Sequence, residues 1–304
     1  MPEQSPWFRP RGGFTRDGWE SVVDATLPGW AHTGLRVADF GGGGARELSA
    51  AELERIVVPL AGSCEIAWTD PDGTEGTVVL EGRTSVFDGP TDVAYLPVGT
   101  GAVISGRGRI AVAEAPATRR HPLRVVAKDD VAVELRGAGR SSRQVHNFGT
   151  PANLDAEKLI VCEVITPAEN WSSYPAHKHD EHVPGHESRL EEIYYFESDV
   201  ARGLEAPDGA DPFGMFATYT SPAGDIDINA IVKTGDIALV PFGYHGPAVA
   251  APGYDLYYLN VMAGPDAERE WRISDDPAHA WVRSSWDDQR IDPRLPYTAH
   301  QEGR

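Results

Sequence analysis

The segment DIALVPFGYH (residues 236–245) closely matches an earlier segment of the same chain, DVAYLPVGTG (residues 92–101). The two align without a gap, and each consists of an apolar run followed by Pro-x-Gly. Proline cannot donate to a sheet ladder and therefore ends strand pairing, while glycine permits a tight reversal. Each copy predicts a β-strand that ends in a turn. The repeat therefore predicts two similar β units in tandem.

Short apolar runs of this kind occur throughout the 304 residues. They are rich in Val, Ile, Tyr and Phe, and the 24 Pro and 32 Gly of the chain separate them. Such runs are typical of an all-β sandwich or barrel. Helical periodicity is nearly absent, and only SAAELERIV (residues 49–57) is expected to form a helical turn or two. We expect an all-β fold with few short helices, divided into residues 1–130 and 131–304.

The composition restricts the partners of the chain. A formal net charge of −19 disfavours nucleic acid and anionic membranes, because phosphate groups are bound by clustered Lys and Arg. No run approaches the roughly 20 apolar residues that span a bilayer, and the first residues lack the pattern of a signal peptide. Cys64 and Cys162 lie in apolar runs and are expected to be buried thiols. We expect a cytoplasmic protein, with a homodimer suggested by analogy with other symmetric β proteins.

The second unit contains imidazoles and carboxylates at metal-ligand spacing. His177 and His179 are two residues apart, so on a strand their side chains face the same side. Glu191 and Glu192 precede an apolar run, and His245 follows the turn of the second repeat. Three imidazoles and one carboxylate suit a divalent ion such as Zn²⁺, Mn²⁺, Fe²⁺, Co²⁺ or Ni²⁺, with positions left open for substrate.

This pattern resembles the two motifs of the cupin superfamily, whose barrels hold a metal ion. The resemblance favours Glu192 as the carboxylate ligand, because the cupin glutamate usually sits directly before the apolar strand residues. Glu191 is the alternative, since the loop between His179 and the glutamates is longer than usual. In the first unit Gly101 takes the place of His245. We therefore expect one metal ion per chain, held by the second barrel.

A narrower resemblance covers nearly the whole chain. Its most specific parts are WSSYPAHKHD (residues 171–180) and GYDLYYLNVMAGP (residues 253–265), and RQVHNFGTP (residues 143–151) and LEEIYYF (residues 190–196) support it. These segments are similar to the 5-deoxy-glucuronate isomerase family of myo-inositol catabolism, which is related to the 5-keto-4-deoxyuronate isomerases. The resemblance implies a tandem cupin fold and an aldose–ketose isomerase. Its substrate would be a small sugar acid, 5-deoxy-D-glucuronate, and its product 5-dehydro-2-deoxy-D-gluconate.

Such a reaction requires a base for the C2 proton and a cation for the substrate carboxylate. Glu163 is the leading candidate base, because it is an acidic residue inside an apolar run, where burial would raise its pKa. An ion pair between Glu163 and an arginine is the structural alternative. Arg143 and Lys178 are candidate partners of the carboxylate, and Tyr258 is expected to contact the substrate.

Three other functions fit the same ligand set. One is a related uronate isomerase, the second is an Fe²⁺-dependent cupin dioxygenase, and the third is a non-enzymatic sugar-binding bicupin with a structural metal. Oxygen consumption separates an isomerase from a dioxygenase. Loss of activity on chelation, with recovery when metal is restored, separates an enzyme from a binding protein.

Overall fold

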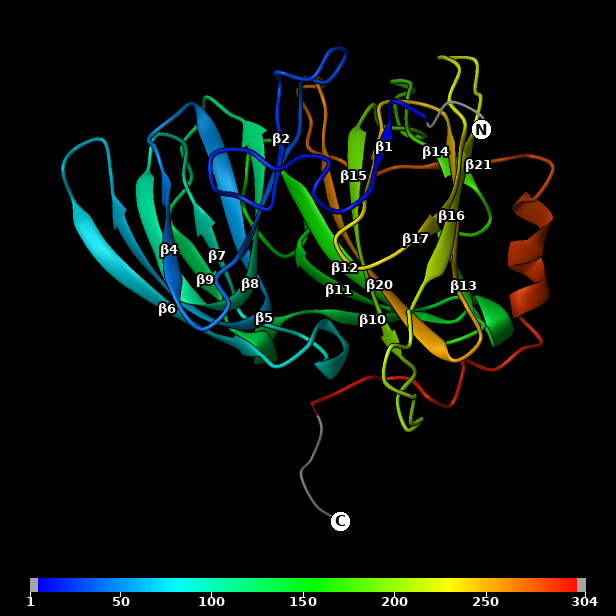
Figure 1. The fold of residues 1–304 in the computed structure, drawn as a ribbon. Coiled ribbons are helices and arrows are strands. Elements are labelled where there is room, and N and C mark those ends of the chain that lie inside the picture. Colours follow the sequence, from blue (N-terminus) through cyan, green and yellow to red (C-terminus); the bar gives the residue numbers. More distant parts are fainter. Residues whose placement is uncertain (1–4, 300–304) are drawn as a thin grey trace.

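The computed structural model describes residues 5–299, which form three antiparallel sheets with a few short 3₁₀ helices between the strands. Figure 1 shows the sheets arranged as two barrel-like units that lie side by side. The prediction of an all-β fold with few short helices is confirmed. The 3₁₀ helices are η1 (Val86–Asp88), η2 (Lys128–Asp130), η3 (Gly139–Ser141) and η4 (Ala280–Trp286).

The first barrel is a single eight-stranded sheet. Two strands of 17 and 16 residues, β5 and β8, pair along nearly their whole lengths and carry the other strands. The register of β5 shifts near Pro59 and again near Gly62, and such bulges let a long strand bend into a barrel. Its strands are β2 (Ser21–Val23), β3 (Gly34–Asp39), β4 (Gly44–Leu48), β5 (Leu53–Thr69), β6 (Glu75–Arg83), β7 (Val93–Leu96), β8 (Gly101–Pro116) and β9 (Arg124–Val126).

The second barrel consists of a seven-stranded and a six-stranded sheet. The seven-stranded sheet contains β1 (Phe8–Arg9), β10 (Val133–Arg136), β11 (Arg143–Gly149), β12 (Ile160–Thr166), β15 (Glu191–Val200), β18 (Ile237–Val240) and β20 (Tyr254–Ala263). The six-stranded sheet contains β13 (Trp171–Ser172), β14 (His177–Lys178), β16 (Gly214–Tyr219), β17 (Ile228–Val232), β19 (Tyr244–Ala250) and β21 (Ser274–Asp275).

The strands change from the first barrel to the second between β9 and β10, and the predicted division at residue 130 falls in this interval. One strand departs from chain order. β1, near the N-terminus, pairs with β18 of the second barrel, so residues on both sides of the division contribute to the seven-stranded sheet.

The seven-stranded sheet is buried on both faces. One face packs with the six-stranded sheet around a core that includes Tyr194, Phe196 and Phe216. The other face packs against the first barrel in a shared core that includes Tyr195 and Tyr257. A third core lies within the first barrel. Burial on both faces explains why β12 and β20 are almost uninterrupted apolar runs rather than alternating ones.

The sequence repeat corresponds to the same local structure in both barrels. β7 and β18 each end directly before the Pro-x-Gly turn. Gly99 and Gly243 occupy matching positions and have φ angles of 84° and 98°, which a residue with a Cβ rarely adopts. Glycine at this position is therefore required by the backbone in both copies.

The expected helical turn at residues 49–57 is wrong, because residues 53–69 form the long strand β5. Ile56, Val58 and Leu60 contribute to the core that the two barrels share, whereas Val57 faces the core of the first barrel. Burial of both faces therefore gave this segment a run of apolar residues without clear alternation. Tertiary packing overrides the weak local preference for helix.

A buried ion pair joins the two barrels. Both terminal nitrogens of Arg83, at the end of β6, donate to the two carboxylate oxygens of Glu163 on β12, each at 2.7 Å. His146 and the Tyr257 hydroxyl also contact this carboxylate, at 2.6 and 2.7 Å. Burial acts to raise the pKa of Glu163, but Arg83 and His146 lower it to about 2. The stability that this ionised carboxylate provides is therefore present above its ordinary pKa of 4.5 and lost as the pH falls toward 2.

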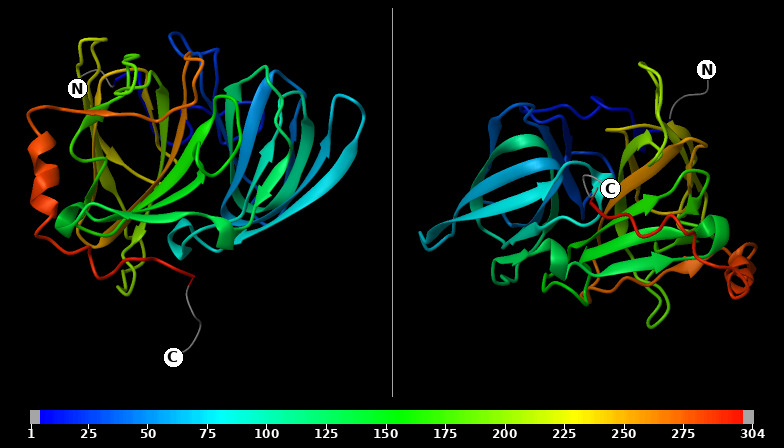
Figure 2. Two further views of the ribbon diagram at one scale, coloured as in Figure 1. Left: turned by 180° about the vertical axis from the view of Figure 1, so that it is seen from behind. Right: turned by 90° about the horizontal axis from the view of Figure 1, so that it is seen from below.

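The C-terminal segment also connects the two barrels. After η4 the chain returns along the second barrel toward the junction, as the view from below in Figure 2 shows. The backbone N–H of Tyr297 donates to Gln144, and Tyr297 is part of the shared core. The carbonyl of Thr298 accepts a hydrogen bond from Arg202.

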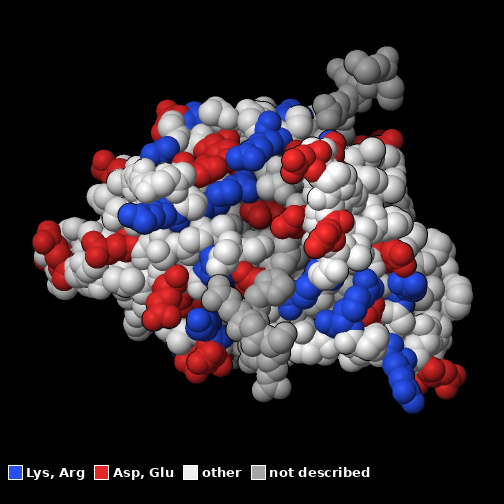
Figure 3. Space-filling model, turned by 60° about the horizontal axis from the view of Figure 1, so that its bottom comes forward, with Lys and Arg blue, Asp and Glu red and all other residues white. Residues whose placement is uncertain are grey.

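Charged residues of both signs are mixed on the surface. On the face drawn in Figure 3, Lys and Arg lie beside Asp and Glu. Cys64 and Cys162 are buried free thiols, as expected. Within residues 5–299, no helix is long and apolar enough to cross a membrane.

Substitution of Arg83 by Met should lower the free energy of unfolding by about 3–5 kcal/mol, because it leaves the Glu163 carboxylate buried without its cation. Equilibrium unfolding in urea measures this change. Arg107 is exposed, so Arg107→Met is the matched control and should change stability by no more than about 0.5 kcal/mol. Equal stabilities of the two variants would contradict a role for the ion pair in joining the barrels.

Candidate metal centre

Four predicted metal-ligand side chains meet inside the second barrel, although they come from three strands and a loop. His177 on β14 pairs with His245 on β19, so these two imidazoles lie side by side, with ring centroids 4.5 Å apart. His179 follows β14, and its ring centroid lies 4.6 Å from that of His245. Glu192 approaches from β15 in the opposite sheet. Its Oε2 atom lies 3.0 Å from His179 Nε2 and 3.1 Å from His245 Nε2.

Backbone carbonyls orient all three imidazoles in the same way. The Nδ1 atoms of His177, His179 and His245 lie 3.1–3.3 Å from the carbonyl oxygens of Pro175, Leu190 and Gly243. A carbonyl only accepts, so each Nδ1 carries the hydrogen when these bonds form. The Nε2 atoms of His179 and His245 then face Glu192, where His179 Nε2 lies 3.0 Å from the carboxylate, and with Nδ1 protonated each Nε2 can present a lone pair to an ion. Metal-binding histidines are commonly fixed by such a hydrogen bond from the second ring nitrogen.

Burial and neighbouring charges shift the pKa values of three residues in the cluster. Burial acts to raise the pKa of Glu192, but the neighbouring imidazoles of His179 and His245 lower it to about 2. Burial acts to lower the pKa of His179, but Glu192 raises it above 6.5. Burial, together with the neighbouring His245 and His179, holds the pKa of His177 well below 6.5. The carboxylate is therefore ionised and His177 is neutral near pH 7.

One atom of the cluster lacks a hydrogen-bond partner and indicates a ligand. His245 Nε2 is buried, and although it lies 3.1 Å from Glu192, it forms no hydrogen bond. The nearest donor atoms of His179, Glu192 and His245 all lie within 4.8 Å of one another. An unpaired lone pair that faces an ionised carboxylate fits a shared divalent cation. The residues present therefore fit the predicted metal ion.

Glu191, the alternative carboxylate, points to the other face of β15. Its oxygens accept hydrogen bonds from the backbone N–H groups of Ala31, His32 and Thr33 in the first barrel, at 2.7–3.3 Å. Adjacent strand residues face opposite sides of a sheet, so only one of the two glutamates can reach the histidines. The structure places Glu192 there.

Lys178 does not contribute to the cavity, which corrects its prediction as a substrate contact. Its Nζ atom donates to carboxylate oxygens of Asp180, Glu181 and Glu187 at 2.7–2.8 Å. Lys178 lies between two histidines that face the cluster, so strand alternation turns it away.

Glu163 is also outside the cavity, which corrects its prediction as the base. It faces the first barrel and forms the ion pair with Arg83 described above, whereas its neighbour Val164 lines the cavity. Its pKa is lowered, which is opposite to the expected direction. The alternative of a structural ion pair with an arginine is the one that the geometry supports.

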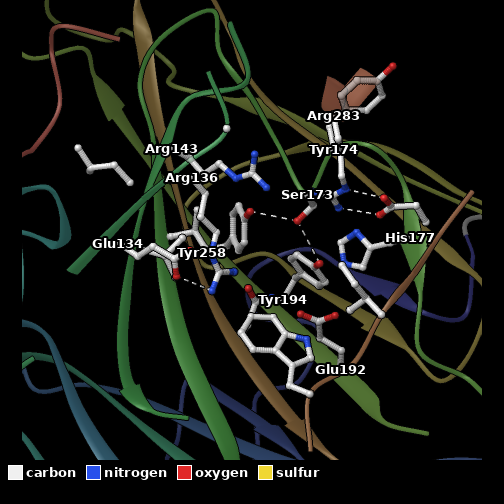
Figure 4. A pocket seen from close by; sticks show the side chains of 18 of the residues that line it. Glu134, Arg136, Arg143, Ser173, Tyr174, His177, Glu192, Tyr194, Tyr258 and Arg283 are labelled. Carbon is white, nitrogen blue, oxygen red and sulfur yellow. Dashed lines mark hydrogen bonds and ion pairs between the residues drawn. The ribbon is translucent and has the colours of Figure 1, made fainter. Parts of the chain in front are cut away.

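A cavity of about 640 Å³ opens beside the cluster, and Figure 4 shows the side chains around it. Three arginines line it, and within residues 5–299 two of them have acidic partners. Arg136 pairs with Glu134 at 2.9 Å, and Arg283 pairs with Asp275 at 2.6 Å. The full lining is Glu134, Leu135, Arg136, Gly137, Arg143, Val145, Val164, Ser173, Tyr174, His177, Glu192, Tyr194, Tyr258, Asn260, Trp271, Ile273, Asp275, Arg283 and Trp286.

Arg143 is the cavity arginine without an acidic partner. Its side chain donates to the backbone carbonyl of Ser141 at 3.0 Å and lies over the ring of Trp286. Among residues 5–299, no carboxylate forms an ion pair with it. Burial lowers the pKa of Arg143 to about 10, so the guanidinium remains charged at neutral pH. This uncompensated charge can bind a carboxylate of a ligand.

Hydroxyl groups lie between Arg143 and His177, as Figure 4 shows. Ser173 Oγ is 3.0 Å from the hydroxyl of Tyr258 and 3.2 Å from that of Tyr194. Ser173 has a φ of 47°, which is unfavourable for a residue with a Cβ and is found most often at functional sites. Tyr258 therefore lines the cavity, where Ser173 contacts its hydroxyl group, and its contact with the substrate stays a prediction.

Sequence reasoning missed the cavity residues that come from segments without a periodic pattern. Ser173 lies in the loop before β14. Trp271, Arg283 and Trp286 come from the segment after β20, which crosses to the six-stranded sheet through β21 and continues into η4. Only Ser173 carried a signal, because it belongs to the specific segment WSSYPAHKHD.

Comparison with known proteins places this geometry in context. A sequence model described as the KduI/IolB family matches residues 8–282. A 5-deoxy-glucuronate isomerase from Geobacillus kaustophilus is 37% identical over 288 residues, which cover 94% of this chain and 95% of that protein. The 5-deoxy-glucuronate isomerase of Bacillus subtilis strain 168 is 35% identical over 251 residues, which cover 82% of this chain and 86% of that protein.

Solved structures show the same fold. An IolB-like protein from Salmonella typhimurium LT2 superposes with a TM-score of 0.79 and 33% identity, covering 91% of this chain and 99% of that one. An oxalate decarboxylase from Lactobacillus farciminis superposes with a TM-score of 0.57 at 11% identity, covering 90% of this chain and 85% of that one. The second likeness shows the fold alone. The prediction of tandem cupin barrels is confirmed.

Substitutions at the two neighbouring glutamates should separate the ligand from the structural residue. Glu192→Gln should lose most of its bound metal, because the neutral amide removes the charge that the cation requires. Glu191→Gln should retain the metal and lose about 1–3 kcal/mol of stability, because it weakens hydrogen bonds to the first barrel. Elemental analysis of the purified variants and urea unfolding measure both effects. Metal loss from Glu191→Gln alone would contradict the placement of Glu192 as ligand.

Proposed function

This isomerase chain belongs to the KduI/IolB family, and on that premise we propose that it converts 5-deoxy-D-glucuronate into 5-dehydro-2-deoxy-D-gluconate in myo-inositol catabolism. The observation that carries the proposal is the convergence of His179, His245 and Glu192, with the ring of His177 beside that of His245, next to a cavity whose Arg143 has no acidic partner within residues 5–299. A metal-binding end and a carboxylate-binding end match the two ends of an open-chain uronate.

His177, His179, Glu192 and His245 would hold one divalent ion, with Zn²⁺, Mn²⁺, Fe²⁺, Co²⁺ and Ni²⁺ all compatible with this donor set. When bound, such an ion supplies a Lewis acid for the oxygens of C1 and C2, where charge develops during isomerisation. The buried Nδ1 hydrogen bonds keep the imidazoles oriented, so the donor atoms need little reorganisation on binding.

Arg143 would bind the substrate carboxylate through charge-assisted hydrogen bonds. Its charge has no acidic partner within residues 5–299, and its guanidinium is buried, where such hydrogen bonds are strong. Arg136 and Arg283 are less suited to this role, because Glu134 and Asp275 already neutralise them. The carboxylate at Arg143 would orient the sugar so that its aldehyde end lies at the histidines and Glu192.

The hydroxyl groups of Tyr194, Ser173 and Tyr258 would face the middle of the substrate. Hydroxyls both donate and accept hydrogen bonds, so they can pair with sugar hydroxyl groups of either orientation. The strained backbone of Ser173 keeps its hydroxyl between the two tyrosines before substrate arrives. Such prior ordering reduces the entropy that binding must remove.

The substrate assignment is tested by an NMR time course in D₂O with 5-deoxy-D-glucuronate. We expect resonances of 5-dehydro-2-deoxy-D-gluconate to appear, at an equal rate under anaerobic conditions. Deuterium at C6 of the product, the carbon that was C1 of the substrate, identifies transfer of the C2 hydrogen as a proton, whereas complete retention of hydrogen there is expected of a hydride shift. Treatment with EDTA should abolish turnover, and a restored divalent metal should recover it. Unchanged turnover after removal of all metal would contradict metal dependence.

The role of Arg143 is tested by Arg143→Met. We expect kcat/KM for 5-deoxy-D-glucuronate to fall about 10- to 100-fold, because a hydrogen bond to a charged group contributes about 1.5–3 kcal/mol. Arg140 is three residues away, with a side chain that is 67% exposed, and it pairs with Glu169 at the surface. Arg140→Met is therefore the matched control, with kcat/KM within about twofold of the parent. A similar effect in both variants would remove Arg143 from carboxylate binding.

A further inference from the structure

Six buried side-chain nitrogen or oxygen atoms in residues 5–299 have no hydrogen-bond partner, and two of them belong to side chains that line the cavity. These two are Asn260 Nδ2 and Trp271 Nε1. Both are hydrogen-bond donors. A buried donor without an acceptor destabilises the fold, so two of them in one cavity require an explanation.

The side-chain nitrogen of Asn260 forms no hydrogen bond within residues 5–299. It lies on β20, is 3% exposed, and its strand neighbours on the same face are Tyr258 and Met262. Across the sheet it pairs with Cys162 and Tyr194. The hydroxyl groups of the two tyrosines are engaged with Ser173. Asn260 is therefore a polar side chain on an aromatic and apolar wall, with its donor left free.

Asn260 is also close to the metal-binding end of the cavity. Its cross-strand partner Tyr194 is two residues from Glu192 on the same face of β15, and Glu192 itself pairs with Met262. Asn260 and Glu192 therefore lie on neighbouring strands and on the same face of the sheet, offset by two residues along the strands. An amide at this position faces the part of the cavity where the reacting carbons of the substrate would lie.

Trp271 holds the second unpaired donor. It follows β20 and lines the same cavity, and the guanidinium carbon of Arg136 lies 5.2 Å from the centre of its ring. This contact fixes the indole plane, and the ion pair with Glu134 in turn fixes Arg136. The indole N–H can only donate, so an acceptor that enters the cavity is needed to satisfy it.

We propose that Asn260 and Trp271 form a neutral hydrogen-bonding subsite for the oxygen atoms of the sugar acid, with Asn260 donating to an oxygen of the reacting end. The inference rests on the proposed function, because it assigns these donors to the substrate of that cavity. Donors aimed at the oxygen where charge develops act more strongly in the transition state than in the ground state. Asn260 therefore contributes mainly to kcat, and Trp271 contributes to substrate positioning.

The proposal predicts that loss of the Asn260 amide does not destabilise the fold. A structural asparagine stabilises the fold, whereas an asparagine with an unpaired donor costs stability in the absence of substrate. Replacement of an unpaired buried polar group by an apolar group of the same shape is neutral or stabilising. Asn260→Leu should therefore keep or raise the melting temperature of the metal-loaded protein and still lower activity.

The test compares Asn260→Leu with Asn170→Leu. Asn170 is equally buried, but its side chain is fully bonded, donating to Ser142 and Asp292 and accepting from Arg294. We expect Asn170→Leu to lower the melting temperature clearly. We expect Asn260→Leu to melt no lower than the parent, with equal metal content and with kcat for 5-deoxy-D-glucuronate reduced about 10- to 100-fold. Trp271→Phe, which removes the N–H and keeps a ring, should raise KM about 5- to 10-fold at unchanged stability.

Two results would overturn the inference. One is a fall in the melting temperature of Asn260→Leu as large as that of Asn170→Leu, which would make the amide structural. The other is a kcat of Asn260→Leu within twofold of the parent. If the parent itself does not turn over 5-deoxy-D-glucuronate, the proposed function fails, and the subsite is then judged with D-glucuronate as probe. D-Glucuronate should then raise the melting temperature of the parent. Loss of this increase in Asn260→Leu supports the subsite, and an increase that persists in Asn260→Leu contradicts it.

Discussion

A carboxylate surrounded by imidazoles in a barrel interior imposes the strongest constraint on this protein. Glu192 is buried and ionised, and its nearest polar neighbours are His179 and His245. A third imidazole, His177, is held neutral by burial and by the other two rings. Such a cluster is stable when a cation is shared among the four side chains. It also requires both sheets of the second barrel, because the histidines and the glutamate lie on opposite sides of the interior.

The first barrel supports this arrangement although it lacks the ligands of the repeat. Strand alternation turns Glu192 inward and its neighbour Glu191 outward, where backbone N–H groups of the first barrel bind it. In the same way Val164 faces the cavity while Glu163 binds Arg83. The strands β15 and β12 are therefore held by contacts on their outer face, where Glu191 and Glu163 bind the first barrel. Each of these glutamates is next in sequence to a residue that faces the cavity. The first barrel, in which Gly101 takes the place of His245, therefore still has a structural role in the site.

Much of the site could be predicted from sequence because its signals are local. The His-x-His pair, the glutamate before a strand and the histidine after Pro-x-Gly each specify a position within one element. The two errors have different causes. Glu163 has the pattern of a buried base, but Arg83, 80 residues earlier, pairs with it. Lys178 was predicted to bind the substrate carboxylate, but strand alternation turns it away from the histidines, toward the nearby carboxylates of Asp180 and Glu187. Trp271 and Arg283 carried no signal, because they reach the cavity through a segment without periodicity.

The central claim is that one cation is bound by His177, His179, His245 and Glu192. X-ray absorption spectroscopy of the protein loaded with a single equivalent of Zn²⁺ or Mn²⁺ tests it most directly. The account predicts a first shell of nitrogen and oxygen atoms at about 2.0–2.2 Å for Zn²⁺. The outer-shell scattering should indicate three imidazoles, and His245→Ala should reduce that number. A shell of oxygen atoms alone, or one that His245→Ala leaves unchanged, would place the metal elsewhere and contradict the account.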